Sequence, residues 1–130
     1  MGTTISHCPL SVHATLVEMA IVVRIAGRSS GSAEEGSNCR SELLRVYAAA
    51  PELVVVDLSE LQDINSAVLG ALLLCRRLSM GASGTLRLAG VRPAVREVLA
   101  RTRLLMLFHC LPDVAAALAA DVSQSRRGQH

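Results

Sequence analysis

The clearest hydrophobic pattern in the chain is a run of four apolar residues, Leu53–Val56, that ends in Asp57. A polar stretch, 59–66, separates this run from a long aliphatic segment that continues to Met80. A buried strand, a loop and a helix is the simplest interpretation of this order. The junction Asn65–Ser66 would place small polar side chains at a helix N-terminus, where backbone N–H groups lack partners. We expect a functional site at this junction.

The predicted helix over 66–80 has two different sides when its residues are placed about 100° apart. One side is a typical core stripe: Val68, Ala71, Leu72, Cys75 and Leu78. The opposite side combines small residues with one leucine and one cation: Ser66, Gly70, Leu73 and Arg77. A solvated face normally carries more charge, so this side is a candidate contact surface. An exposed leucine without any role is the alternative.

Two strands are expected before this segment. Alternation over residues 10–16 predicts a half-buried strand, with polar Ser11, His13 and Thr15 facing outward. Its inward side would consist of the apolar residues Leu10, Val12, Ala14 and Leu16. The apolar run 20–25 predicts a second strand, and the short connection favours a hairpin. The Gly- and Ser-rich stretch 27–37 is predicted to be a loop.

A helix is expected from about residue 37 or 38 to Ala50, where Pro51 ends it. Its inward side would hold Cys39, Leu43, Val46, Tyr47 and Ala50, with Arg40, Glu42 and Arg45 outward.

The C-terminal third predicts four further elements. Residues 85–89 alternate as a strand with Leu86 and Leu88 inward, and Arg92-Pro93 begins a helix. The inner side of that helix would be Val95, Val98, Leu99 and Thr102, and the outer side Arg92, Arg96 and Arg101. The apolar run 105–110 predicts a last strand, and 112–113 opens a final helix. That helix would turn Val114, Ala117 and Leu118 toward the core.

The expected order is therefore ββαβαβαβα, an α/β fold with a mixed, mostly parallel sheet and helices packed on it. The hairpin would lie at one edge of the sheet. We expect one domain over residues 10–121, a flexible N-terminus over 1–9 and a disordered polar tail over 122–130.

Composition narrows the possible partners. The formal net charge is only +2 and every basic residue is Arg, with 2% aromatic residues, so neither charge nor base stacking favours nucleic acid. No apolar run approaches the roughly 18 residues of a membrane span, and no signal peptide is visible, so we expect a cytoplasmic protein without a membrane partner. The four cysteines are Cys8, Cys39, Cys75 and Cys110; none forms a CxxC pair, so we expect reduced thiols and no metal site.

The sequence contains no assembled catalytic motif. A phosphate-binding GxxxxGK[ST] loop, a GxGxxG turn and a GxSxG elbow are all absent. Asp57 and Asp63 could together bind a metal, but each more readily serves a turn. His13 and His109 are expected to be a solvated and a structural histidine. We therefore expect no enzyme and no cofactor.

The residues VVVDLSEL over 54–61, then NSAVLGALL over 65–73, resemble the STAS domain of bacterial anti-sigma factor antagonists. The later stretch LRLAGVRPAVREVLARTRLLMLF, over 86–108, is similar to that family's fourth strand, third helix and last strand. The resemblance covers about residues 10–120. It implies a STAS-like fold and a regulatory protein that binds an anti-sigma factor.

The differences from the family lie at the junction itself. The family reads Asp-Ser-Ser/Thr-Gly there, and a partner anti-sigma factor that is a kinase phosphorylates the second hydroxyl. That position is Ala67, which has no hydroxyl, while Asn65 replaces the acid and Val68 the glycine. The acidic residue that the family carries shortly after its second strand is also missing after Gly27. Ser66 could be a displaced acceptor, but as the expected N-cap its hydroxyl would bind backbone N–H groups.

The resulting hypothesis is a binding module that contacts an anti-sigma factor or a related kinase-like protein, without phosphorylation at the usual residue. The expected contact residues are Asn65, Ser66, Ala67, Val68, Gly70, Leu73 and Arg77. One alternative is a non-catalytic scaffold or oligomerisation subunit, such as a homodimer built on an apolar outer face. A second is a domain that holds a small ligand or an anion near the helix N-terminus.

Overall fold

The computed structural model describes residues 10–17, 20–27, 33–81 and 84–119. The elements within these residues follow the predicted order, with one added 3-10 turn. They are β1 (Leu10–Val17), β2 (Ala20–Gly27), α1 (Ala33–Tyr47), β3 (Leu53–Asp57), α2 (Ser66–Gly81), β4 (Thr85–Ala89), α3 (Pro93–Arg101), η2 (Leu105–Leu107), β5 (His109–Leu111) and α4 (Val114–Ala119). The proposed flexible segment 1–9 and tail 122–130 lie outside the described residues.

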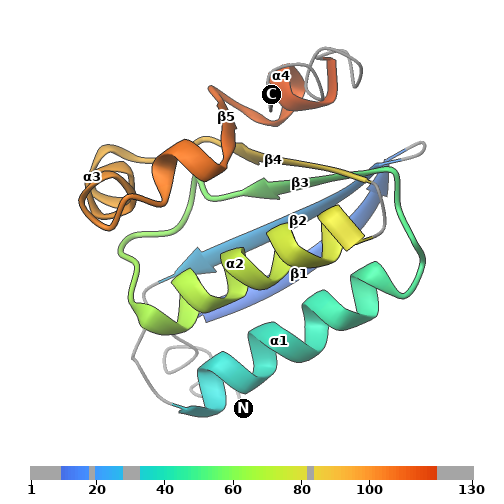
Figure 1. The fold of residues 1–130 in the computed structure, drawn as a ribbon, viewed down its shortest axis with the longest axis horizontal. Helices are drawn as coiled ribbons and strands as arrows, with labels where there is room; N and C mark the ends of the chain where they lie inside the picture. The colour runs from blue at the N-terminus through green and yellow to red at the C-terminus, as the bar shows by residue number, and fades with distance from the viewer. Residues whose placement is uncertain (1–9, 18–19, 28–32, 82–83, 120–130) are drawn as a thin grey trace, which may run out of the picture.

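The strands form one five-stranded sheet in the order β1-β2-β3-β4-β5 (Figure 1). β1 and β2 are antiparallel, and every later neighbour is parallel. The predicted mixed sheet with its hairpin at one edge is therefore confirmed. Because β2, β3 and β4 run in the same direction, the residues that follow them meet at the carboxyl ends of these strands.

Each face of the sheet carries its own apolar cluster. One face, here called the helical face, is covered by α1, α2 and α3, and alternate strand residues such as Val54 and Val56 pack with residues of these helices. On the opposite face, Leu53 and Val55 pack with Ala117 and its neighbours in α4. Cover on both sides explains why β3 is buried at all five positions and why its sequence lacks alternation.

β1 departs from the predicted half-buried strand. Val12 packs against the helical-face core, but Ala14 is exposed and Leu16 is 73% exposed. His13 is exposed on the opposite face, as expected. The apolar alternation of β1 is real, but the helices leave Ala14 and Leu16 uncovered.

In β4, Leu86 and Leu88 face the core beneath α1, α2 and α3 as predicted, but the other three residues of the strand are buried as well. Arg87, between the two leucines, is fully buried, and its Nη1 donates to the carbonyl oxygen of Ala117, 2.5 Å away. The reason is α4, which covers this part of the opposite face and presents a carbonyl from its last turn to the cation.

Three boundaries and the positions of two side chains, Ala50 and Thr102, also differ. α1 begins at Ala33, inside the predicted loop 27–37, and ends at Tyr47, so Ala50 lies beyond it with a positive φ of 51°. The run 105–110 forms a 3-10 turn followed by a three-residue strand instead of one strand. Thr102, predicted to face inward, is exposed at the C-cap of α3. Among the described residues, no helix has the length and apolarity needed to cross a bilayer.

Candidate functional site

The connection from β3 to α2 starts at the carboxyl ends of the parallel strands and ends at the N-terminus of α2 (Figure 1). Its two ends are built differently. The first, from Asp57 to Leu61, is tied to the ends of three strands. The second, from Asn65 onward, presents the start of α2.

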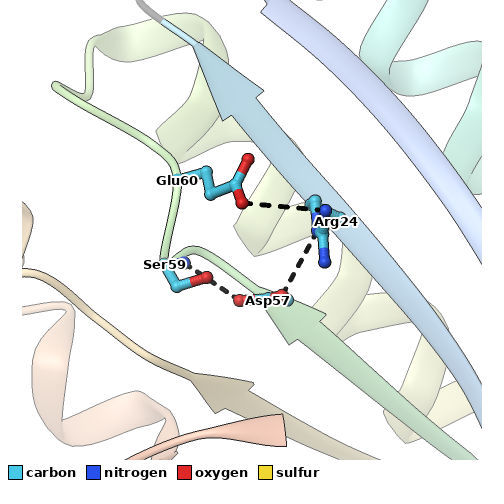
Figure 2. Close-up of polar contacts among 4 residues, drawn as sticks. All are labelled: Arg24, Asp57, Ser59 and Glu60. Carbon is cyan, nitrogen blue, oxygen red and sulfur yellow. Dashed lines mark hydrogen bonds and ion pairs between the residues drawn. The ribbon is translucent and has the colours of Figure 1, made fainter.

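Asp57 organises the first end of the connection (Figure 2). Its Oδ2 lies 3.4 Å from Nε of Arg24, the residue beside it in the β2–β3 register. Its Oδ1 accepts the backbone N–H of Ser59 at 3.0 Å, so the predicted turn role of Asp57 is confirmed. Glu60 adds a longer ion pair to Arg24, at 3.8 Å. The carboxylate is almost fully buried, and the cation and the turn N–H together satisfy it.

Backbone hydrogen bonds fix the same end on both sides. Gly27 donates to the carbonyl of Glu60 at 3.0 Å, and Gln62 donates back to the carbonyl of Gly27 at 2.8 Å. On the other side Leu58 donates to the carbonyl of Ala89 at 2.9 Å. Gly90, with φ of +65°, passes so close to the connection that an added Cβ would lie 2.8 Å from Cβ of Ser59.

Sequence reasoning missed Arg24 as part of this site. It is the only charged residue in β2, and an isolated charge within an apolar strand signals a specific partner. The register that brings it beside Asp57 is a tertiary feature, so the sequence alone could not identify that partner.

Asn65 caps α2 at the second end. Its side-chain Oδ1 accepts the backbone N–H of Ala67 at 3.0 Å and that of Val68 at 3.4 Å, while its carbonyl accepts the N–H of Leu69 at 2.9 Å. The prediction of Ser66 as the N-cap was therefore wrong by one residue. The Asn65 amide satisfies the first turn, which leaves the exposed Ser66 hydroxyl uninvolved in that cap.

The expected contact residues do not all reach the surface. Ser66, Gly70, Leu73 and Arg77 are exposed, and Asn65 and Ala67 are partly exposed. Val68 is fully buried among the helical-face core, so its side chain cannot contact a partner directly. Val68 also belongs to the predicted core stripe, which is confirmed at Val68, Ala71, Leu72 and Cys75, whereas Leu78 is only partly buried.

The exposed side of α2 is apolar and positively charged. Met80 is 62% exposed and lies seven residues after Leu73, so the two side chains fall on the same side of the helix. Together they add exposed apolar area to this side. The helix contains Arg76 and Arg77 but no Asp or Glu. This surface is suited to a partner that offers apolar and acidic side chains.

The geometry gives little material for catalysis or metal binding. Asp57 is engaged by Arg24, and the described residues contain no group of three or more His, Cys, Asp or Glu that could hold a metal. The described cysteines, Cys39, Cys75 and Cys110, are free thiols. Burial raises the pKa of Cys75 to about 12, so this thiol stays protonated and unreactive at neutral pH.

Comparison with known proteins identifies the family of the chain. A sequence model of the STAS domain matches residues 12–117. A search of curated proteins found no significant match.

Solved structures share the fold at low sequence identity. An anti-sigma factor antagonist from Mycobacterium paratuberculosis superposes with a TM-score of 0.75 at 20% identity, covering 90% of this chain and 94% of that one. An RsbS variant from Moorella thermoacetica gives 0.71 at 22% identity, with 89% and 95% covered. A structure described as the molecular architecture of the stressosome gives 0.70 at 22% identity, with 88% and 96% covered.

Proposed function

Because the chain belongs to the STAS domain family, we propose that it is a non-catalytic regulatory module of the cytoplasm that binds an anti-sigma factor or a related kinase-like protein. The binding surface would be the exposed side of α2 from its N-terminus to Arg77. The observation that carries this proposal is the apolar, acid-free side of α2, held at a fixed position by the Asn65 cap and the Asp57–Arg24 pair.

The side chains on this surface favour protein binding over small-ligand binding. Leu73 is exposed on a helix whose inner stripe already fills the core, so its apolar area is available to a partner. Arg77 lies one helical turn beyond and could pair with a carboxylate. An aliphatic anchor beside a cation is a common element of protein interfaces, in which the apolar contact supplies affinity and the charge supplies specificity.

The regulatory step would differ from phosphorylation at residue 67. Ala67 offers no hydroxyl, so a phosphate cannot be added there. A phosphate at the start of α2 would add about 1.5 to 2 negative charges to a surface that is apolar and positive, and would oppose an acidic partner. Without that charge, the surface stays competent for binding unless something else covers it.

Ser66 is the remaining hydroxyl at the start of α2. Its exposure and its absence from the helix cap leave it accessible to a kinase. It nevertheless lies one residue before the family's acceptor position, about 100° away around the helix. We propose that a kinase positioned for residue 67 does not use it.

Binding can be tested with the double variant Leu73→Asp/Arg77→Glu and purified kinase-type anti-sigma factors. We expect a loss of at least ~100-fold in affinity, measured by titration calorimetry, because both contacts at the centre of the surface are reversed in character. The matched control is Leu107→Asp/Arg92→Glu, which changes an equally exposed leucine and an exposed arginine away from α2. Equal losses in the two variants, or none in the first, would contradict the proposed surface.

The phosphorylation state has its own test. The protein would be incubated with ATP and the partner kinase and analysed by mass spectrometry. We expect no phosphate on the native chain and one phosphate on Ala67→Ser. A phosphate on the native chain that disappears in Ser66→Ala would show instead that the acceptor has moved by one residue.

A further inference from the structure

The opposite face of the sheet is covered by α4 alone within the part of the chain that the structure describes. α4 lies across β3, β4 and β5, on the side of the sheet away from α1 and α2 (Figure 1). Ala117 of α4 completes a small apolar cluster there with Ala20, Leu53, Val55 and Ala89 of the strands. The burial of these strand residues therefore depends on one short helix.

α4 offers little apolar area for its docking. It has six residues, Val114–Ala119, of which only Ala117 is buried, while Val114 and Leu118 are partly buried. Isolated helices shorter than about 12 residues are marginal in water, so α4 needs the sheet to stay helical. The free energy of docking is small, because the apolar contribution scales with the area removed from water.

A charge is buried beneath this helix. Arg87 of β4 is fully buried, and its Nη1 donates to the carbonyl oxygen of Ala117. A guanidinium keeps its proton in proteins, so the docked state always holds a cation away from water. This bond is not the only interaction of Arg87, so the cost arises from burial of the charge and not from a missing partner. An apolar side chain of similar size would fill this space at equal or lower free energy, so Arg87 weakens the docking of α4.

The segment before α4 lets the helix move separately from the strands. Two residues, Pro112 and Asp113, connect β5 to α4. Asp113 caps the helix: its Oδ1 accepts the N–H of Ala116 at 2.8 Å, and its carbonyl accepts the N–H of Ala117 at 3.0 Å. Neither bond joins α4 to the sheet, so the helix can leave without breaking a strand pairing.

We propose that α4 is a hinged cover that leaves the sheet by local unfolding in the native protein, and that the buried charge of Arg87 sets how often it does so. Segments with few buried apolar contacts open at a lower free energy than the whole domain. In the open state Arg87 is hydrated, and Leu53, Val55 and Ala89 are accessible. The core on the helical face stays folded. The exposed side of α2 takes no part, so this inference does not depend on the proposed partner.

The first experiment measures opening by cysteine labelling. Ala89→Cys places a thiol beneath α4, and native Cys75, buried in the core on the helical face, reports on that core in the same molecule. The two sites are compared after timed exposure to iodoacetamide, by mass spectrometry of the peptides. The thiol at position 89 should react at least ~30-fold faster than Cys75, because α4 opens without global unfolding. A thiol at position 89 that reacts at the rate of Cys75 or more slowly overturns the proposal.

The second experiment measures hydrogen exchange of the Ala117 amide by NMR. In the native chain this amide should exchange at least ~100-fold faster than that of Leu72 in the helical-face core. Arg87→Met removes the buried charge and keeps an unbranched side chain, so it should slow exchange at Ala117 by at least ~10-fold.

The matched control is Arg40→Met at an exposed arginine of α1, which should leave the rate at Ala117 within about twofold of the native rate. Equal exchange at Ala117 and Leu72 in the native chain would show that α4 opens only with the whole domain, and would overturn the hinged cover. Unchanged or faster exchange in Arg87→Met, or failure of this variant to fold, would overturn the role of the charge.

Discussion

The two ends of the β3–α2 connection use opposite chemistry. The first end is polar and enclosed: Asp57 is buried, paired with Arg24 and bonded to the turn N–H of Ser59. The second end is open and lacks acidic side chains: Asn65 caps the helix, and Ser66, Gly70 and Leu73 face solvent. The enclosed end fixes the direction of the chain, and the open end presents a surface.

This difference separates residues that position the start of α2 from residues that it presents. The positioning residues are buried or hydrogen-bonded, whereas Ser66 and Ala67 in the first turn are exposed or partly exposed. Positioning depends on several strands, so losing it would destabilise the fold. The side chains of the first turn are single exposed or partly exposed groups, so they can change at little cost in stability. Mutations at the enclosed end should therefore affect folding more than mutations at the open end.

The largest effect is expected for Gly90→Ala at the enclosed end. Alanine is strained at φ of +65°, and its Cβ would lie 2.8 Å from Cβ of Ser59. We expect a loss of about 2 to 3 kcal/mol in the free energy of unfolding, measured by urea denaturation. Gly81→Ala is the control, since nothing lies within 4 Å of its added Cβ. Similar losses in both variants would contradict both the backbone strain at residue 90 and the close contact with Ser59.

Arg24→Met should have the next largest effect. It leaves the Asp57 carboxylate buried without its cation, and the remaining bond from the Ser59 N–H offsets only part of that cost. We expect a loss of about 2 kcal/mol in unfolding free energy, below the cost of a fully buried pair because Arg24 is half exposed.

The control is Arg101→Met, which breaks an exposed pair with Glu97 on α3. Exposed pairs of this kind contribute about 0.5 kcal/mol or less. If the two arginine variants lose the same amount, Asp57 does not depend on Arg24 and the enclosed end is held by its backbone bonds alone.

These positions also show what the sequence could and could not predict. β3 and the inner stripe of α2 were predictable because their patterns report burial directly, and Val54 and Leu72 are buried as expected. The alternation of β4 correctly placed Leu86 and Leu88 inward but could not show that Arg87 is buried, because a local pattern contains no information about α4, which covers the other face. Short apolar runs are ambiguous as well: the run 105–110 predicts one strand, where the structure has a 3-10 turn and a three-residue strand.

The start of α2 could be predicted in place but not in detail. The helix start at residues 65–66 is confirmed, because small polar residues before an aliphatic run are a strong helix-start signal. That this junction is a functional site stays a prediction. Choosing between Asn65 and Ser66 as the cap requires backbone geometry, since both side chains can accept the same N–H groups. The partner of Asp57 depends on strand register, which a single sequence does not determine.

Asn65→Ala tests the open end at moderate effect. It removes the oxygen that accepts the N–H groups of Ala67 and Val68, and we expect a loss of about 1 kcal/mol in unfolding free energy. Ser66→Ala should change this free energy by less than about 0.3 kcal/mol, since Ser66 does not make the cap and alanine suits a first helical turn. A larger loss at Ser66 than at Asn65 would restore the original assignment of the cap.

The smallest expected effect is a gain, from Gly70→Ala. Glycine in the middle of a helix costs about 0.5 to 1 kcal/mol relative to alanine, and no atom lies within 4 Å of the added Cβ. The free energy of unfolding should therefore rise by about this amount. If a partner packs closely against this part of α2, the new methyl group should at the same time lower its affinity. A gain in stability with unchanged affinity would move the contact away from Gly70, toward Leu73 and Arg77.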